Sequence, residues 1–292
     1  MHPGTRLRAL LARPEIVVLP GVYDALSARI AQAHGFEALL AGGNAATGVL
    51  LGEPDLGQLS MRDYIDHYAR IAAATTLPLL VDADTGFGGI HNVQQMVRFF
   101  ERAGVAGFFM EDQATPKRCG YLAGKAVIPV GEMVGKIHAA LDARRDPALV
   151  ICARTDALGI HGREEAIERA QRYREAGADM IFVQGADRME DLRAICDAVP
   201  GPQLANVSQA AQLAAQPVSE IERAGASAVM YSITTMLAAA RAVDNVLGAL
   251  RRDGHLGAVG SELMPIRQYN ELVGLGAKEE AEKRYAAHAV AV

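Results

Sequence analysis

The sequence of 292 residues has few of the features that hold a small extracellular protein together. Its three cysteines, Cys119, Cys152 and Cys196, are odd in number and lack Cys-x-x-Cys spacing, which argues against a disulfide framework and a zinc site. The N-terminus lacks the apolar core and cleavage pattern of a signal peptide. No run of about 18 apolar residues occurs. We therefore expect a cytoplasmic protein that does not bind membranes.

The sequence also lacks an excess of basic residues. Its formal net charge is −5 and its lysines and arginines are scattered, whereas nucleic-acid binding usually needs a basic face. Half of the residues are hydrophobic and 22% are charged, so the chain has enough apolar material for a core. We expect a folded protein that does not bind nucleic acid.

Eight short apolar runs recur along the chain. They are rich in Val, Ile, Leu and Phe and are bounded by Gly, Pro or Asp, which is typical of strands buried on both faces of a parallel sheet. The runs cover residues 15–21, 37–43, 77–86, 106–112, 148–156, 178–185, 202–208 and 227–232. Amphipathic segments that end in glycine lie between them, among them 24–35, 93–104 and 164–177. The first of these opens on Asp24, which is suited to cap a helix.

Eight strand–helix units predict an α/β fold of the (β/α)8 TIM-barrel type. The alternative is an open doubly wound sheet, which the lack of a dinucleotide-binding fingerprint after the first strand disfavours. We expect residues 1–254 to form the catalytic barrel. Residues 255–292 are expected to form a C-terminal helical extension that packs on the barrel or on a partner subunit.

Acidic residues stand where a barrel of this type places its active site, at the carboxyl ends of the strands. Asp82 and Asp84 are two residues apart on the third strand, so both should point into the barrel. Two carboxylates so close are costly unless a cation lies between them, and Glu111 ends the next strand. Because every candidate ligand is an oxygen, the set favours a hard cation such as Mg²⁺. The alternative is that these acids are helix caps and ion-pair partners.

Arg154 ends the fifth strand, where its guanidinium would hold an anionic substrate, most naturally a carboxylate. Its alternative role is to balance the charge of Asp82 or Asp156. Gly42 and Gly43 can expose backbone N–H groups to a second anionic group, although an ordinary tight turn explains them equally well. The other strand-end residues that we expect to bind substrate are Ala41, Asn44, Gln184, Asn206 and Ser208.

Cys119 lies in a loop directly after Lys117 and Arg118, and two glycines occur within the next five residues. Neighbouring cations lower the pKa of a thiol, and glycines let a loop move. We therefore interpret Cys119 as a reactive thiol on a mobile lid. Cys152, in an apolar strand, and Cys196, in an amphipathic helix, are expected to be inert core residues.

Four motifs occur together in this chain: VDADTGFG (81–88), EDQ (111–113), PKRCG (116–120) and ARTDA (153–157). In this order and spacing they resemble the isocitrate lyase/phosphoenolpyruvate mutase superfamily, and within it the 2-methylisocitrate lyase-like branch. The resemblance extends from about residue 19 to residue 254, which is most of the chain.

The resemblance implies a barrel that assembles as a homotetramer, a dimer of dimers, with a C-terminal helix exchanged between subunits. It implies Mg²⁺, or Mn²⁺ in its place, held mainly through water by Asp82, Asp84 and Glu111, and a small-molecule carboxylate as substrate. The residues that we assign to catalysis are Cys119, Arg154, Asp55 and Lys117. Gly120 and Tyr121, which follow Cys119, join the substrate-binding set.

We expect a Mg²⁺-dependent carbon–carbon lyase in which Cys119 is the general acid. Its substrate would be a 2-hydroxy di- or tricarboxylate, of the 2-methylisocitrate or 2,3-dimethylmalate type, cleaved into a 2-oxo acid and a carboxylate. Three positions in the expected pocket depart from the lyase pattern: Tyr121 replaces histidine, Leu39–Gly42 replaces Tyr-x-Ser-Gly, and Gln184 replaces glutamate. Two alternatives therefore stay open. One is an oxaloacetate decarboxylase or 2-oxo-diacid hydrolase of the same superfamily, and the other is a non-catalytic protein that binds a 2-oxo acid.

Overall fold

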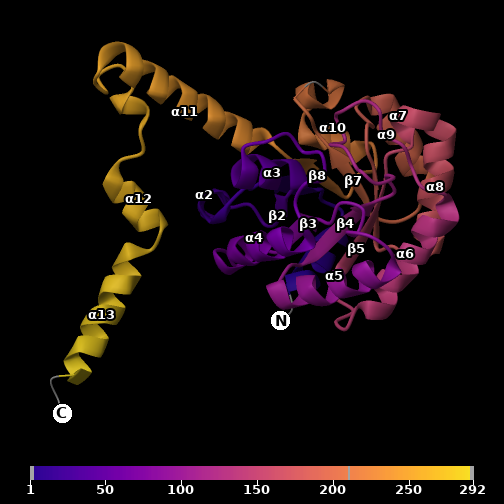
Figure 1. The fold of residues 1–292 in the computed structure, drawn as a ribbon, viewed down its shortest axis with the longest axis horizontal. Helices are drawn as coiled ribbons and strands as arrows, with labels where there is room; N and C mark the ends of the chain where they lie inside the picture. Colours follow the sequence, from indigo (N-terminus) through magenta and orange to yellow (C-terminus); the bar gives the residue numbers. More distant parts are fainter. Residues whose placement is uncertain (1–2, 210, 290–292) are drawn as a thin grey trace. The chain divides into compact units, whose positions relative to one another are not determined.

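The computed structural model of the protein describes residues 3–209 and 211–289 (Figure 1). The chain forms two compact units, Met1–Met236 and Leu237–Val292. The first contains eight strands and the helices that connect them, and the second is built from the C-terminal helices. No helix in the described residues is both long enough and apolar enough to span a membrane.

The eight strands form one parallel sheet in the order β1-β8-β7-β6-β5-β4-β3-β2. They are β1 (Val17–Pro20), β2 (Leu39–Ala41), β3 (Leu79–Asp82), β4 (Gly107–Glu111), β5 (Val150–Thr155), β6 (Met180–Val183), β7 (Gln203–Asn206) and β8 (Ala228–Tyr231). A parallel bridge between Gly21 and Leu40 joins the first two strands, so the sheet curls into a nearly closed barrel. The predicted (β/α)8 barrel is confirmed. The open-sheet alternative is wrong, because strands adjacent in sequence are neighbours all the way round.

Helices follow the strands and surround the barrel (Figure 1). In the first unit they are α1 (Pro3–Leu11), α2 (Ala25–Ala33), α3 (Gly43–Leu51), α4 (Met61–Ala73), α5 (Ile90–Ala103), α6 (Val130–Ala143), α7 (Leu158–His161), α8 (Arg163–Glu175), α9 (Met189–Ala198) and α10 (Val218–Arg223). The three helices predicted at 24–35, 93–104 and 164–177 are α2, α5 and α8. Asp24 caps α2 as expected, because its carboxylate accepts the Ser27 N–H at 2.7 Å.

The C-terminal unit continues α11 (Thr234–Asp253) into α12 (Ile266–Leu272) and α13 (Leu275–Ala289). Several of its large apolar side chains are more than half exposed, namely Val243, Leu247, Ile266 and Tyr285. Large apolar side chains exposed to this degree are typical of surfaces that pack against another chain. The homotetramer and the exchange of a C-terminal helix between subunits stay predictions.

Alternate residues of each strand point into the barrel and pack together in its interior. They include Leu19, Leu40, Leu80, Phe109, Cys152, Phe182, Leu204 and Met230. The intervening residues face the surrounding helices and form two outer clusters. Inside the barrel the rings of Phe109 and Phe182 pack edge to face, with centroids 5.7 Å apart. The same alternation decides which residue at each strand end faces the mouth of the barrel.

We expect Phe182→Ala to lower the free energy of unfolding by about 3–5 kcal/mol, because it removes a ring from the barrel interior and leaves a cavity. The Phe182 side chain is fully buried. Urea denaturation followed by circular dichroism measures the change. Leu26→Ala, at an exposed position of α2, is the control and should cost less than about 1 kcal/mol. Equal losses in the two variants would contradict this prediction.

Candidate active site

The inward-facing residues at the carboxyl ends of the strands line one cavity. Asp82, Glu111 and Asn206 end their strands, while Gln184 and Ser232 directly follow theirs. The predicted site residues in the lining are Gly42, Gly43, Asn44, Asp55, Asp82, Glu111, Lys117, Cys119, Gly120, Tyr121, Arg154, Gln184 and Asn206. Strand alternation and the loops that follow the strands therefore bring most of the predicted site together.

Two predicted substrate-binding residues, Ala41 and Ser208, are not part of this lining. Ala41 points outwards with Leu39 into the cluster between the barrel and the helices, because Leu40 between them points inwards. The prediction that Ala41 and Leu39 face the pocket is therefore wrong. Ser208 lies in the turn after β7, where its carbonyl accepts the Ala211 N–H.

Asp82 and Asp84 lie close together, but not for the predicted reason. β3 ends at Asp82, and Asp84 has a left-handed backbone with φ 45°, so the two are not on one strand. The Asp84 N–H donates to the Asp82 carboxylate at 2.9 Å. Both carboxylates also lie against Gly43, because a Cβ atom there would be within 3.2 Å of an oxygen of each. The turn after the strand, rather than the strand itself, brings the two carboxylates together.

Gly43 lies in a space too small for any residue that has a side chain. Its N–H donates to the Asp82 carboxylate at 2.9 Å. A Cβ atom there would lie 2.5 Å from the Tyr64 hydroxyl oxygen, which is closer than atoms can approach. The N–H of this glycine was expected to meet an anionic group of the substrate, whereas the anion that it binds is a carboxylate of the protein.

Lys117 bridges two buried carboxylates. Its Nζ lies 2.7 Å from oxygens of both Asp55 and Asp84. Burial alone would lower the pKa of Lys117, but the nearby carboxylates of Asp84, Asp82 and Glu111 outweigh it and raise that pKa. The ammonium was expected to act on the Cys119 thiol, but its contacts are with these acids.

Asp84 itself is held partly in its protonated form. Burial raises the pKa of Asp84 to about 7, with Asp82 and Asp55 adding to the shift and Lys117 opposing it. Its other oxygen accepts a hydrogen bond from the Tyr64 hydroxyl at 3.1 Å. Burial and the neighbouring carboxylates of Asp82 and Asp55 together therefore outweigh the Lys117 ammonium at Asp84.

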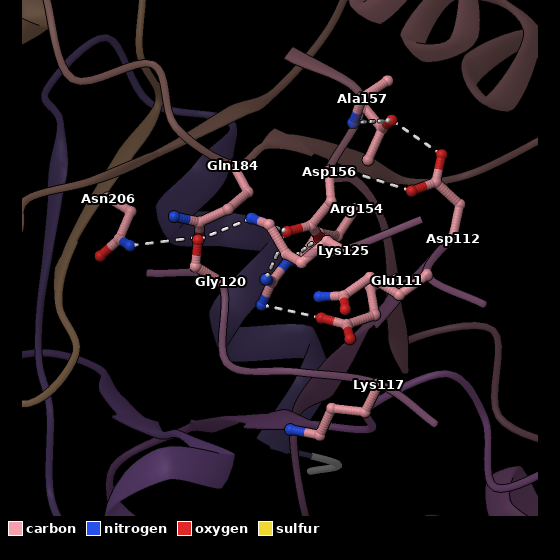
Figure 2. A network of polar contacts seen from close by, with 12 residues as sticks. Glu111, Asp112, Lys117, Gly120, Lys125, Arg154, Asp156, Ala157, Gln184 and Asn206 are labelled. Carbon is pink, nitrogen blue, oxygen red and sulfur yellow. Dashed lines mark hydrogen bonds and ion pairs between the residues drawn. The ribbon is translucent and has the colours of Figure 1, made fainter. Parts of the chain in front are cut away.

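Arg154 is clamped between two acids (Figure 2). Its Nη1 lies 3.0 Å from Glu111, and its Nε and Nη2 donate to Asp156 at 2.9 and 3.1 Å. The guanidinium also stacks on the Phe182 ring, 5.2 Å from its centroid. Charge balance by Asp156, which was the alternative role of Arg154, is therefore part of its structural setting. Burial raises the pKa of Glu111 well above its usual range, against the opposing effect of Arg154.

Asp112 supports this clamp from behind. Because it alternates with Glu111, it points away from the cavity and is fully buried. Its carboxylate accepts the Asp156 N–H at 2.9 Å and the Tyr173 hydroxyl at 2.8 Å, and it pairs with Arg169 at 3.2 Å. The sequence did not predict that Asp112 supports Asp156 from behind the site. The alternation along β4 is the signal that separates the two neighbouring acids.

The loop that carries Cys119 (residues 116–125, hereafter the Cys119 loop) lies across the cavity. The Cys119 N–H donates to the Asp55 carbonyl at 3.1 Å, and its Sγ accepts the Asn44 amide at 3.0 Å. A Cβ atom on Gly120 would lie 2.5 Å from Arg154 Nη2, so only glycine fits there. Lys125, at the far end of the loop, donates to the Gly120 carbonyl at 2.6 Å and to Asp156 at 2.8 Å. The loop is thus closed over the site.

The charges at this end of the barrel do not balance. Five carboxylates are buried here, those of Asp55, Asp82, Asp84, Glu111 and Asp156. Three cations contact them, Lys117, Lys125 and Arg154, so full ionisation leaves an excess of two negative charges. Oε1 of Glu111 is buried and has no hydrogen-bond partner among the described residues.

A hydrated divalent cation fits this excess of charge. Carboxylate oxygens are the ligands that Mg²⁺ prefers, and Mg²⁺ usually keeps several of its waters. Within residues 3–209 and 211–289, no three Asp, Glu, His or Cys side chains are arranged to hold a metal ion directly. The observations that suit a cation here are the buried carboxylates and the unpartnered oxygen of Glu111.

Comparison with known proteins places the chain in a family. The model of the phosphoenolpyruvate phosphomutase family matches residues 7–251. The chain belongs to this family. It is 36% identical to a 2,3-dimethylmalate lyase from Eubacterium barkeri over 98% of this chain and 99% of that protein. It is 43% identical to a 2-methylisocitrate lyase from Shewanella oneidensis over 86% of each chain. These relatives are carbon–carbon lyases, as the sequence motifs predicted.

Solved structures of the same superfamily share the fold. Oxaloacetate acetylhydrolase in complex with the inhibitor 3,3-difluorooxalacetate has a TM-score of 0.92 and 36% identity, over 98% of this chain and 97% of that chain. Phosphonopyruvate hydrolase in complex with oxalate and Mg²⁺ has a TM-score of 0.88 and 30% identity, over 98% and 100% of the two chains. Small carboxylate ligands therefore occur in structures similar to this one, in one case with Mg²⁺.

We expect Asp112→Ala to lower the free energy of unfolding by about 3–5 kcal/mol, because it leaves the Arg169 guanidinium buried with a lost partner. Chemical denaturation measures the loss. Glu165→Gln is the control: Glu165 is the other carboxylate on Arg169 and is partly exposed, so its loss should cost less than about 1 kcal/mol. If the control costs as much as Asp112→Ala, the supporting role of Asp112 is refuted.

The three thiols should differ in reactivity. Burial raises the pKa of Cys196 to about 12 and that of Cys152 well above its usual range, so both stay protonated and unreactive at pH 8. Cys119 lines the cavity, and the predicted mobility of its loop would make the thiol accessible to a reagent. We expect the folded protein to consume one equivalent of iodoacetamide at pH 8, and Cys119→Ser to consume almost none, as measured by intact mass. One equivalent consumed by Cys119→Ser would contradict this expectation.

Proposed function

We propose that this protein cleaves a carbon–carbon bond of a 2-hydroxy carboxylate of the 2,3-dimethylmalate or 2-methylisocitrate type and releases a 2-oxo acid. One observation carries the proposal: a single cavity joins the Cys119 thiol on a closed loop to the Arg154 guanidinium and to the buried carboxylates of Asp55, Asp82 and Glu111. Those are the parts that such a cleavage needs, namely a proton donor, a carboxylate anchor and a cation site.

Asp82, Asp84 and Glu111 would hold Mg²⁺, or Mn²⁺ in its place, largely through water. The excess of two negative charges and the unpartnered Glu111 oxygen support this assignment. Bound Mg²⁺ would supply Lewis-acid stabilisation of the oxyanion that forms at C2 of the substrate. Lys117, between Asp55 and Asp84, would keep these acids in place and limit their mutual repulsion.

Arg154 would anchor the carboxylate beside the reacting carbon. Its contacts with Glu111 and Asp156 fix the plane of the guanidinium, and an arginine has five N–H groups, so donors remain for the substrate. Gly120 brings the loop backbone against the same guanidinium. The substrate carboxylate would thus be held where the closed loop excludes water.

Cys119 would supply the proton that completes the reaction. Once a basic group of the site has accepted the proton of the C2 hydroxyl, the C2–C3 bond breaks, a carbonyl forms at C2, and the electron pair of the broken bond passes to C3. The thiol then donates its proton to C3, giving the second carboxylate product.

We expect Cys119→Ala to lower kcat by about 100-fold or more, because a positioned general acid contributes roughly that factor. A coupled assay for 2-oxo acid, with 2,3-dimethylmalate and 2-methylisocitrate as substrates and Mg²⁺ in the buffer, measures the rate. Cys196→Ala, on α9 and outside the cavity lining, is the control and should retain full activity. Unchanged turnover in Cys119→Ala would reject the proposed role of the thiol.

Hydrolysis of oxaloacetate is a second candidate function. It is supported by the similarity to oxaloacetate acetylhydrolase over almost the full length of both chains, with a TM-score of 0.92. Product analysis separates the candidates: hydrolysis of oxaloacetate gives oxalate and acetate, decarboxylation gives pyruvate and carbon dioxide, and the lyase reaction releases a 2-oxo acid from a 2-hydroxy acid. Oxalate formation above the rate in a protein-free Mg²⁺ control would favour the hydrolase.

A further inference from the structure

A second group of polar side chains lines the same cavity and carries no charge. Its members are Tyr121, Gln184, Asn206 and Ser232, hereafter the neutral wall. Three of them come from the strand ends of β6, β7 and β8, and Tyr121 reaches them from the Cys119 loop. Asn206 also donates to the Gln184 carbonyl oxygen at 3.4 Å, as Figure 2 shows for this pair.

Tyr121 closes a ring of hydrogen bonds within this wall. The Asn206 amide donates to the Tyr121 hydroxyl at 2.9 Å, and the Ser232 hydroxyl donates to the Asn206 carbonyl oxygen at 3.2 Å. The Tyr121 and Ser232 oxygens are 3.1 Å apart, so Tyr121 donates the third bond. The Tyr121 phenol therefore covers Asn206 and Ser232. It also uses the hydrogen-bonding groups with which these two residues would bind a ligand.

The cations of the cavity are largely committed elsewhere. Those in its lining, within the described residues, are Lys117, Arg118 and Arg154. Lys117 and Arg154 already contact two carboxylates each, and the Arg118 guanidinium lies beside Gly124 of its own loop. A substrate carboxylate directed at the neutral wall would therefore find hydrogen-bonding groups there, but no positive charge to pair with.

We propose that Tyr121 determines specificity, restricting the substrate to a dicarboxylate with small alkyl groups and rejecting a tricarboxylate. The inference rests on the proposed function and deepens it. One carboxylate would be met by Arg154 and the cation site, and a second by the side-chain N–H groups of Gln184, which take no part in the ring of hydrogen bonds. A third would be buried against the phenol ring without a partner, and burying an unpaired charge is costly.

The test compares kcat/KM for 2,3-dimethylmalate, a dicarboxylate, with that for 2-methylisocitrate, a tricarboxylate. We expect the natural protein to prefer the dicarboxylate by about 100-fold, and Tyr121→Ala to reduce this preference at least about tenfold by freeing the space, Asn206 and Ser232. Tyr121→Phe keeps the ring, so it should keep most of the preference. Tyr231→Phe is the matched control, because Tyr231 ends β8 directly before Ser232 but packs against the outer cluster. This substitution should leave the preference unchanged.

Binding is measured in parallel, so that failure of the proposed lyase function can be distinguished from failure of the specificity role of Tyr121. Calorimetric dissociation constants of both compounds, with Mg²⁺ present, are determined for the natural protein, Tyr121→Ala and Tyr121→Phe. Selective binding that Tyr121→Ala relaxes supports the inference even without turnover, in which case the proposed lyase function is what fails. Equal handling of the two compounds by the natural protein, or a preference that Tyr121→Ala leaves unchanged, overturns the inference. If Tyr121→Ala does not fold, loss of the preference in Tyr121→Phe overturns it as well, because the ring that should reject the tricarboxylate is still there.

Discussion

The burial of five carboxylates at one end of the barrel against three cations is the constraint on which the rest of the site depends. Each cation links acids or backbone groups from different elements: Lys117 joins Asp55 to Asp84, and Arg154 joins Glu111 to Asp156. Such a network is stable only when it is complete, because a buried charge that loses its partner is strongly destabilising. Within the described residues this network has more acids than cations and leaves Oε1 of Glu111 without a hydrogen-bond partner, which is where the proposed divalent cation would contribute.

The closed Cys119 loop supplies positive charge to the buried acids. Two of the three cations, Lys117 and Lys125, belong to this loop and bind acids that lie outside it. An open loop would take both ammonium groups away and leave Arg154 alone among the acids. Electrostatics therefore favours the closed loop, and closure in turn brings Cys119, Gly120 and Tyr121 onto the cavity. The contacts that neutralise part of the acidic charge are thus the same contacts that hold the reactive loop on the cavity.

The family to which the chain belongs contains lyases, hydrolases and a mutase on one fold, so the fold alone does not choose the reaction. The two sides of the cavity differ in a way that bears on that choice. One side combines acids with Arg154 and suits a 2-oxo acid unit together with a divalent cation. The neutral wall on the other side has no charge with which to hold an additional carboxylate, and the residue that covers it, Tyr121, departs from the lyase pattern.

The sequence by itself determined the barrel and much of the site. Eight apolar runs predicted eight strands, and the acids and Arg154 were correctly expected at their carboxyl ends, whereas Ala41 was expected in the pocket and points outwards. What only the tertiary structure decided lies in the loops: Lys117 turns to Asp55 and Asp84, Gly43 donates to Asp82, and Lys125 and Ser232 enter the site. The physical reason is that strand geometry repeats along the chain and can be read locally. The path of a loop is set by contacts with residues far away in sequence, such as that between Asp55 and Lys117, whose residue numbers differ by 62.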